Sequence, residues 1–207
     1  MNRIETINSF IDKDDKVVDV GCDQAKLSIM LANRNISSIA CDISEKVINK
    51  AKQDITNPLI DLRVSDGLIN IKEGEADTLV LSGMGTYTIL DILNNTKLRF
   101  NKIITISNNY HNILRNKMND LNYKVKEEQI IKENNKYYNL IIFENGKTNY
   151  SEEELELGLN HIDNNMYKEY LDYLLNKYLN IKKSSEDKND NIDRLINLLN
   201  EKIKSIS

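Results

Sequence analysis

Short apolar segments alternate with amphipathic ones along the first two thirds of the chain. Between the apolar segments, hydrophobic residues recur at helical spacing, as in Leu27, Met30 and Leu31. The apolar segments have the length and β-branched content of buried strands, and they cover residues 16–20, 38–42, 60–64, 77–82 and 103–106. A repeated strand and helix is typical of an α/β protein whose parallel sheet is covered by helices on both faces.

The pattern changes after residue 124. Two further strand-like segments, 125–131 and 137–143, are separated only by residues 132–136. Parallel strands need a crossover of about a dozen residues or more, so these two segments must pair antiparallel. Five α/β units followed by an antiparallel hairpin are unlike a dinucleotide-binding dehydrogenase and are similar to the Rossmann-like fold of class I methyltransferases. We therefore expect an α/β fold with a mostly parallel sheet that ends in an antiparallel hairpin.

The C-terminal part has a different pattern. Asn145-Gly146-Lys147 marks a boundary, and a polar run at 184–191 separates two later helical stretches. In each stretch the apolar residues are spaced alternately four and three apart: Tyr167, Leu171, Leu174, Tyr178 and Ile181, then Ile192, Ile196, Leu199, Ile203 and Ile206. This spacing predicts two helices folded back as an antiparallel coiled-coil hairpin. We expect a main domain over residues 1–146 and a helical hairpin domain over residues 151–207.

Composition narrows the functional classes. The chain has 207 residues and a formal net charge of −4. Residues 151–207 hold 8 basic and 12 acidic residues, whereas residues 1–150 hold 20 of each, so binding to a nucleic acid would depend on local patches. Cys22 and Cys41 have no CxxC or histidine companions, which indicates neither a metal site nor a disulfide framework. With no long apolar run and no signal peptide, we expect a soluble, cytoplasmic protein without membrane contact, and a monomer.

Three acids follow the first three predicted strands at similar places: Asp19, Asp42 and Asp66. Open α/β sheets bind ligands beyond the carboxyl ends of their strands. Asp42 can accept hydrogen bonds from ribose hydroxyls, Asp66 from an adenine amino group, and Asp19 can face an ammonium group. Gly21 lets the chain turn sharply beside a ligand. Only this first glycine of a GxGxxG motif is present, which disfavours a nicotinamide-dependent dehydrogenase.

Four stretches carry a family resemblance: VVDVGCDQAKL, SDGL, GEADTLVLSGMG and NKYYNLIIFE. They resemble the bacterial tRNA adenine-N1 methyltransferases that modify position 22 of tRNA, the TrmK family. The resemblance covers nearly the whole chain. Its most specific part runs from Glu75-Ala76-Asp77 through Ser82-Gly83-Met84-Gly85, because a generic methyltransferase does not carry Gly-Met-Gly after the fourth strand. The chain departs from the usual family pattern of histidine, tyrosine, glycine and proline at Gln24, Lys26, Thr86 and Ser107.

The resemblance implies S-adenosyl-L-methionine as the methyl donor, bound by a catalytic domain over residues 1–146. It also implies tRNA as the substrate, held in part by the C-terminal coiled coil. The cofactor-binding residues that we infer are Asp19, Gly21, Cys22, Asp23, Asp42, Ile43, Asp66, Gly67, Ser82, Gly83 and Met84.

The expected chemistry needs little acid–base help. N1 of adenine is a neutral nitrogen with a lone pair, and a sulfonium supplies the leaving group. The protein must mainly align the two, an effect that can supply about 7–11 kcal/mol. A base within folded tRNA must also be turned out of its stack. We expect Asn108 to read the adenine edge and Tyr110 to stack on its face, as the catalytic residues. Gly85, Tyr87 and Arg115 are expected to contact the substrate.

Basic residues around the fifth strand would form a phosphate-binding patch if they share one face. They are Lys97, Arg99, Lys102, Arg115, Lys117, Lys124 and Lys126. Two alternative functions remain open. One is a methyltransferase that acts on another nucleobase or on a small molecule, which the fold alone does not distinguish. The other is a diverged, non-catalytic S-adenosylmethionine-binding protein that uses the hairpin as an interaction surface.

Overall fold

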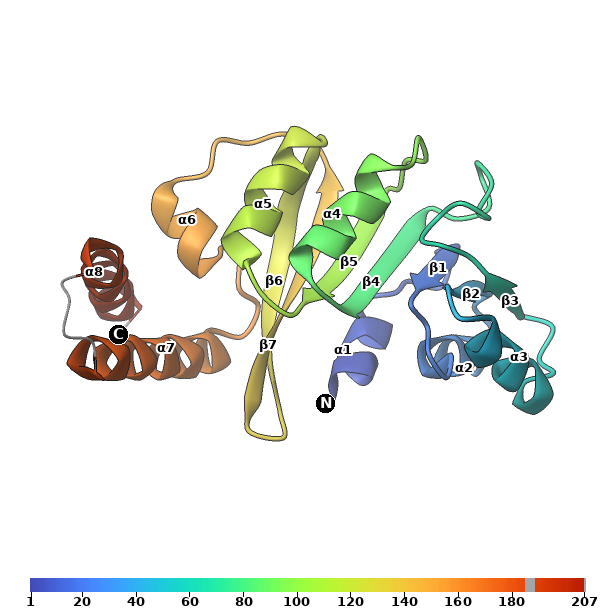
Figure 1. The fold of residues 1–207 in the computed structure, drawn as a ribbon, viewed down its shortest axis with the longest axis horizontal. Coiled ribbons are helices and arrows are strands. Elements are labelled where there is room, and N and C mark those ends of the chain that lie inside the picture. Colours follow the sequence, from blue (N-terminus) through green and yellow to red (C-terminus); the bar gives the residue numbers. More distant parts are fainter. Residues whose placement is uncertain (185–188, 207) are drawn as a thin grey trace.

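A seven-stranded sheet runs through the computed structural model, which describes residues 1–184 and 189–206 (Figure 1). Its strands are β1 (Val17–Val20), β2 (Ser38–Asp42), β3 (Ile60–Val64), β4 (Thr78–Met84), β5 (Lys102–Ser107), β6 (Tyr123–Glu133) and β7 (Lys136–Asn145). The helices are α1 (Arg3–Ser9), α2 (Lys26–Ala32), α3 (Glu45–Asp54), α4 (Thr86–Asn94), α5 (His111–Asp120), α6 (Glu152–Leu157), α7 (Asn164–Ser184) and α8 (Asp190–Ser205).

The strand order is β3-β2-β1-β4-β5-β7-β6. The pairs among β1 to β5 are all parallel. Strand β7 is antiparallel to both β5 and β6, because the link between β6 and β7 is too short for a crossover. The predicted fold class, a mostly parallel α/β sheet with a C-terminal antiparallel hairpin, is confirmed.

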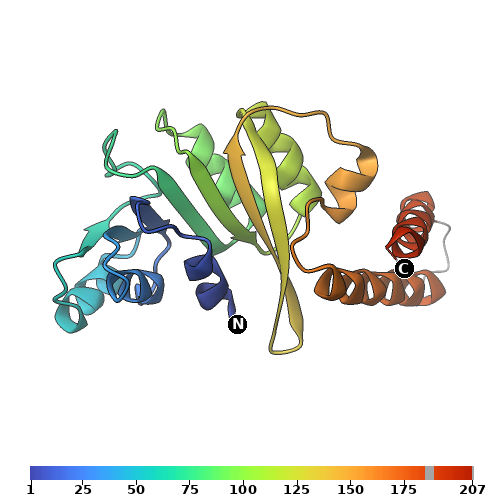
Figure 2. The ribbon, with the colours of Figure 1, turned by 180° about the vertical axis from the view of Figure 1, so that it is seen from behind.

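Alternate side chains of the central strands pack on opposite faces of the sheet. Val18 and Leu79 belong to the core covered by α4 and α5, whereas Val17 and Val80 belong to the core covered by α1 and α2. All four are at most 1% exposed, so the strands are apolar on both faces, as parallel strands require. Seen from behind, the central strands lie in front of α4 and α5 (Figure 2).

Strand β4 and the segment after β7 differ from the expectation. Strand β4 continues to Met84 instead of ending at residue 82, because Gly83 absorbs an irregularity in its pairing with β5. Helix α6 was not predicted, since its six residues are too few for a periodic signal. Its local signal is a capping box, in which Ser151 and Glu154 each accept a hydrogen bond from the other's backbone amide.

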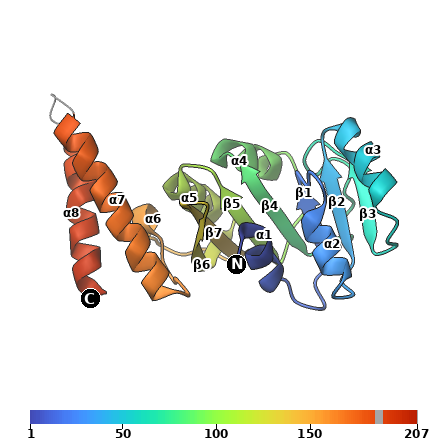
Figure 3. The same ribbon diagram turned by 90° about the horizontal axis from the view of Figure 1, so that it is seen from below.

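Helices α7 and α8 lie side by side and run antiparallel (Figure 3). An ion pair between Lys182 and Asp193 joins the end of α7 to the start of α8. Leu171 and Leu199 are fully buried between them. The predicted polar link at 184–191 lies partly outside the described residues. None of the helices in the described part of the chain is both long and apolar enough to cross a membrane.

The C-terminal helices are fastened to the main domain by ion pairs of α6 and by apolar packing on β6. Arg194 of α8 pairs with Glu152 and Glu156 of α6, and Lys202 pairs with Glu153 at 2.8 Å. Helix α6 in turn packs against α5. Ile130 of β6 belongs to the same apolar cluster as Leu171 and Leu199.

A buried ion pair lies where α5, β6 and the chain after α6 meet. Arg115 is 1% exposed and Glu128 is fully buried. Nε and one terminal nitrogen of Arg115 donate to the two oxygens of Glu128, at 2.8 and 2.7 Å. The other terminal nitrogen donates to the Leu155 carbonyl at 2.7 Å, and Glu128 also accepts from the amide of Leu159 at 3.2 Å. Both charges are therefore satisfied within the protein, and they bind the 155–159 segment to the sheet.

We expect Arg115→Met to lower the free energy of unfolding by about 3–5 kcal/mol, because it leaves the Glu128 carboxylate buried without a cation. Urea denaturation followed by circular dichroism measures the change. The double variant Arg115→Met/Glu128→Leu should recover a large part of the loss, since apolar side chains of similar size often replace a buried ion pair at little cost. A double variant no more stable than the single one would contradict this assignment.

Candidate active site

The carboxyl ends of β1, β2 and β3 lie side by side, and backbone hydrogen bonds tie together the turns that follow them. The amide of Gly21 donates to the carbonyl of Cys41 at 2.8 Å. The amide of Ser65 donates to the carbonyl of Asp42 at 2.9 Å. These bonds bring three acids that the sequence predicted in one site to one edge of the sheet: Asp19, Asp42 and Asp66.

Asp19 is a buried carboxyl group, 7% exposed. Burial and, to a smaller extent, the nearby negative charge of Asp42 together raise its pKa to about 7. A carboxylate in this position lacks the compensation that a cation would give. The site is therefore suited to a ligand that brings a positive charge, such as an ammonium group, against Asp19.

Asp42 ends β2 and begins the turn into α3. Its Oδ1 accepts a hydrogen bond from the amide of Ser44 at 2.9 Å, and its Oδ2 lies 3.4 Å from the amide nitrogen of Asp23. The carboxylate remains half-exposed. The next residue, Ile43, is 69% exposed and offers an apolar face beside the acid. Asp66 and Gly67 form the neighbouring turn after β3, where Asp66 is exposed.

The two cysteines of this region have unreactive thiols. Burial raises the pKa of each thiol to about 12, and the carboxylates of Asp19 and Asp42 act in the same direction. Cys22 and Cys41 are therefore protonated thiols that pack as small apolar groups. In residues 1–184 and 189–206, no group of three or more His, Cys, Asp or Glu side chains is placed to hold a metal ion.

At the ends of β1 and β4, two glycines leave the backbone without a side chain. Gly21 has φ +78°, and a Cβ there would lie 3.2 Å from Cε of Met84. Gly83 has φ +82°, and a Cβ there would meet no heavy atom within 4 Å. Ser82, beside it, is half-buried. Both positions favour glycine by their backbone conformation, and the space at Gly83 lets a ligand approach the backbone.

The loop after β5 lies directly against the end of β4. The Asn108 amide donates to the Met84 carbonyl at 3.0 Å, and its side-chain Nδ2 donates to the Gly83 carbonyl at 3.1 Å. Tyr110 is 54% exposed, and its ring centre lies 5.7 Å from that of Tyr87, which is 57% exposed. An amide and two exposed aromatic rings, next to Gly83–Gly85, can recognise a flat heteroaromatic base.

One departure from the family pattern adds a contact to this loop. Thr86 begins α4, and its hydroxyl donates to the Asn109 carbonyl at 2.5 Å. The hydroxyl of Ser107, another departure, donates to the same carbonyl at 3.2 Å. Glycine and proline, which the family usually has at these positions, have no side-chain donor. The two substitutions therefore add hydrogen bonds to the loop that carries Asn108 and Tyr110.

Two grooves of about 610 Å³ each flank the strand ends, within the size range of small-molecule sites. One lies beside Asp66 and Gly67 and is lined by Leu68, Ile69, Thr88 and Ile92. The other lies beside Asp23 and is lined by Gln24, Lys26, Lys46 and Lys50. The sequence predictions missed Ile69, Ile92, Lys46 and Lys50. The only sequence signal for these residues was the exposed pair Lys46 and Lys50, which are spaced i,i+4 on α3.

Arg115 does not belong to the candidate active site. Its guanidinium is buried against Glu128, and every nitrogen of its fork is used within the protein. The prediction that Arg115 contacts the substrate is corrected accordingly. The predicted basic patch, which included Arg115, is divided: Lys102 pairs with Asp12 and Asp15 at the amino end of β5, away from the acids of the site.

Comparison with known proteins gives one family match. Residues 1–141 match a family model described as a methyltransferase domain. One curated relative, the tRNA (adenine(22)-N(1))-methyltransferase of Bacillus subtilis (strain 168), is 33% identical over 97 residues. That segment covers 44% of this chain and 41% of the relative, so the match spans less than half of either sequence.

Solved structures match over almost the full length. M. capricolum TrmK in complex with S-adenosyl-homocysteine is 28% identical, with a TM-score of 0.86, over 100% of this chain and 99% of that one. Streptococcus pneumoniae Sp1610 in complex with S-adenosyl-L-methionine is 22% identical, with a TM-score of 0.87, over 97% of this chain and 98% of that one. The second likeness shows the shared fold, C-terminal helices included.

The raised pKa of Asp19 predicts a distinctive pH dependence of stability. Its pKa is about 7 in the folded protein and 3.8 in its ordinary state, so the folded state binds more protons between these values. The free energy of unfolding should therefore fall as pH rises through this window, by up to about 1.4 kcal/mol per pH unit. We expect Asp19→Asn, which cannot ionise, to gain stability relative to the natural protein between pH 5 and pH 8.

Urea denaturation of both proteins at pH 5 and pH 8 measures this difference. Burial lowers the pKa of His111 and of His161 to about 4. Both histidines titrate in the variant as in the natural protein, so their contribution cancels. A stability difference that is the same at both pH values would show that Asp19 is not a buried, perturbed acid.

Proposed function

The chain belongs to the methyltransferase-domain family, and we propose that it is an S-adenosylmethionine-dependent enzyme that methylates N1 of adenine 22 in tRNA. The methyltransferase class that the sequence motifs suggested is confirmed by the family match, and the curated relative and the M. capricolum structure support the finer assignment. The observation that carries the proposal is the juxtaposition, at one edge of the sheet, of the three acids and the exposed Asn108, Tyr110 and Tyr87. The three acids suit the polar groups of the cofactor, and Asn108, Tyr110 and Tyr87 suit a nucleobase.

The three acids match the polar groups of the cofactor. Asp42 would accept hydrogen bonds from the ribose hydroxyls, and Asp66 would accept one from the adenine amino group. Asp19 would take the ammonium group of the methionine moiety, which supplies the positive charge that this buried carboxyl lacks. Exposed Ile43 and the groove beside Gly67 give the adenine ring apolar surfaces. When bound, S-adenosylmethionine supplies a methyl group on a positively charged sulfur.

The protein's task at the substrate is alignment. The lone pair of adenine N1 attacks the methyl carbon while the carbon–sulfur bond breaks, so the positive charge moves from sulfur to the base. No proton has to be removed from N1, and no strong base is needed. Asn108, held above Gly83, would read the edge of the base, and Tyr110 and Tyr87 would stack on it.

The two-domain division is part of the proposal. Residues 1–146 form the catalytic domain, and residues 151–207 contact the tRNA away from the target base. Such contacts orient a large RNA without reading its sequence. The proposal also includes the monomeric state and the cytoplasmic location that the sequence led us to expect.

Incubation with labelled S-adenosylmethionine and unmodified tRNA, followed by nucleoside analysis, tests the proposal. We expect label in N1-methyladenosine, and we expect it to disappear when adenine 22 of the tRNA is replaced by guanine. Label in a different nucleoside, or in a small molecule only, would favour a methyltransferase with another substrate. Cofactor binding without any transfer would favour a non-catalytic binding protein.

We expect Asp42→Ala to weaken S-adenosylmethionine binding by about 1.5–3 kcal/mol, the range for hydrogen bonds that involve a charged group. Isothermal titration calorimetry measures the affinity, with a thermal melt to verify folding. Asp14→Ala is the matched control, because Asp14 is an exposed aspartate at the opposite end of β1. Equal cofactor affinity in the two variants would remove Asp42 from the site.

A further inference from the structure

The loop 107–110 between β5 and α5 needs outside support. Tyr110 adopts the left-handed conformation, with φ +51° and ψ +47°, which is unfavourable for a residue other than glycine. The start of the loop is held by the bonds of Asn108 to Gly83 and Met84. Ser107, where the chain leaves the sheet, is held from the other side of the loop sequence by the ring of His111. Whatever orients His111 therefore bears on the position of Asn108 and Tyr110.

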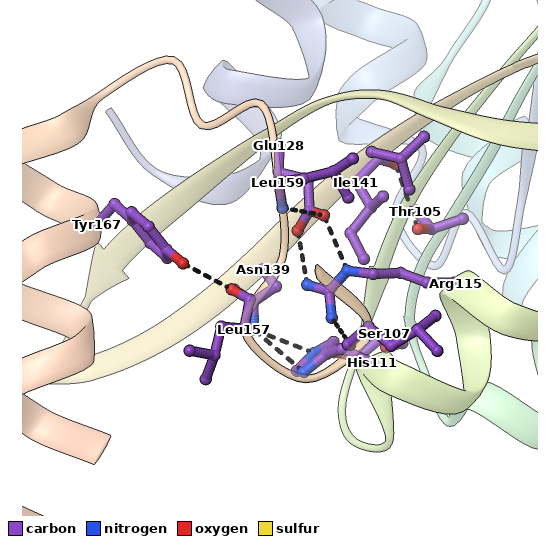
Figure 4. Close-up of polar contacts among 12 residues, drawn as sticks. Thr105, Ser107, His111, Arg115, Glu128, Asn139, Ile141, Leu157, Leu159 and Tyr167 are labelled. Carbon is purple, nitrogen blue, oxygen red and sulfur yellow. Dashed lines mark hydrogen bonds and ion pairs between the residues drawn. The ribbon is translucent and has the colours of Figure 1, made fainter. Parts of the chain in front are cut away.

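His111 contacts the loop through one ring nitrogen. Its Nε2 lies 3.2 Å from the carbonyl oxygen of Ser107, and its Nδ1 lies 3.1 Å from Nδ2 of Asn139 (Figure 4). The two contacts fit a single neutral tautomer, in which Nε2–H donates to Ser107 and Nδ1 accepts from Asn139. Burial and the nearby charge of Arg115 lower the pKa of His111 to about 4, which keeps the ring neutral.

Asn139 connects this histidine to the C-terminal helices. It lies on β7 and is 4% exposed. Its Nδ2 also lies 3.1 Å from the hydroxyl oxygen of Tyr170, which belongs to α7. The amide has two hydrogens, so one can be donated to His111 and the other to Tyr170. Three consecutive hydrogen bonds thus run from α7 to the backbone of the loop.

The first turns of α7 are held firmly against the sheet. Glu169 accepts a hydrogen bond from the hydroxyl of Tyr137 at 2.7 Å and pairs with Lys132 of β6. The hydroxyl of Tyr167 donates to the Leu157 carbonyl at 3.2 Å (Figure 4). The ring of Tyr170 itself packs on Tyr137, with ring centres 5.5 Å apart. Tyr170 is therefore a fixed end for the chain of hydrogen bonds.

We propose that Tyr170, Asn139 and His111 are positioning residues through which helix α7 holds the loop 107–110 in the conformation that receives the target base. The inference rests on the proposed function for its substrate and assigns a second task to the C-terminal helices. Besides contacting tRNA, they set the geometry of the loop that carries Asn108 and Tyr110. These residues act on the reaction through the loop and do not touch the reacting atoms.

The three hydrogen bonds from Tyr170 through Asn139 and His111 to Ser107 form a relay, and two variants interrupt it at different points. Asn139→Leu removes both hydrogen bonds of the amide, and Tyr170→Phe removes only the one at α7. For tRNA methylation we expect kcat to fall roughly 10- to 100-fold in Asn139→Leu, because small displacements of aligned groups have effects of this size. Tyr170→Phe should show a smaller fall. The KM for S-adenosylmethionine should stay unchanged in both, since the three acids are not disturbed.

Tyr173→Phe is the matched control. Tyr173 also lies on α7 and packs on the ring of Tyr137, with ring centres 4.8 Å apart, but it is 46% exposed and makes none of the three hydrogen bonds of the relay. We expect this variant to keep the natural kcat. A fall in kcat as large as that of Tyr170→Phe would mean that any loss of a tyrosine hydroxyl from α7 has the same effect, and it would overturn the proposal.

Hydrogen exchange of backbone amides gives a readout that does not need activity. We expect faster exchange at residues 107–112 in Asn139→Leu and Tyr170→Phe, with exchange in β1 and β4 unchanged. Natural exchange at 107–112, or natural kcat per cofactor-binding molecule in both variants, would overturn the relay. If the natural protein fails to methylate tRNA, the proposed function fails, while the exchange experiment still decides whether α7 holds the loop.

Discussion

The reversal of strand order between β1 and β4 is the constraint on which the site depends. From β1 the chain adds β2 and β3 on one side of the sheet, and it then returns to add β4 and β5 on the other. The helices that follow β1 and β4 must therefore leave in opposite directions, and a crevice opens between them. Asp19 and Gly21 lie at the end of β1, and Gly83 lies at the end of the neighbouring strand β4, so the strand order places the candidate site.

The antiparallel hairpin of β6 and β7 extends the sheet beyond its parallel strands. Strand β7 pairs with β5 on one side and β6 on the other, so the sheet continues past the crevice toward the C-terminal helices. The Arg115–Glu128 ion pair fixes the segment after α6 on this extension, and Asn139 lies on the neighbouring strand. A rigid strand pair thus lies between the place where the C-terminal helices attach and the loop that carries Asn108 and Tyr110, and polar side chains connect the two.

The sequence predicted the parts that depend on local pattern. Asp19, Asp42 and Asp66 were identifiable because each lies at or just beyond the end of an apolar strand. The short link between β6 and β7 dictated the antiparallel pairing of these two strands. Arg115 was misassigned because its burial depends on Glu128, a residue of β6 whose neighbours in the sequence give no sign of a buried charge. The bond from His111 to Asn139 and the bond from Asn139 to Tyr170 join residues 28 and 31 positions apart, and no periodicity encodes them.

The buried ionisable groups make the stability of the fold depend on pH in opposite directions. Asp19 has a raised pKa, so its contribution to stability is lost as pH rises through about 7. His111 and His161 have pKa values lowered to about 4 from 6.5, so their contribution is lost as pH falls through that range. Near neutral pH both histidines are neutral rings, whereas Asp19 is a buried carboxyl group with no cation beside it. A cation beside Asp19 would compensate the buried carboxylate, and under the proposed function the cofactor's ammonium group would be that cation. The fold would then be most stable with the cofactor bound.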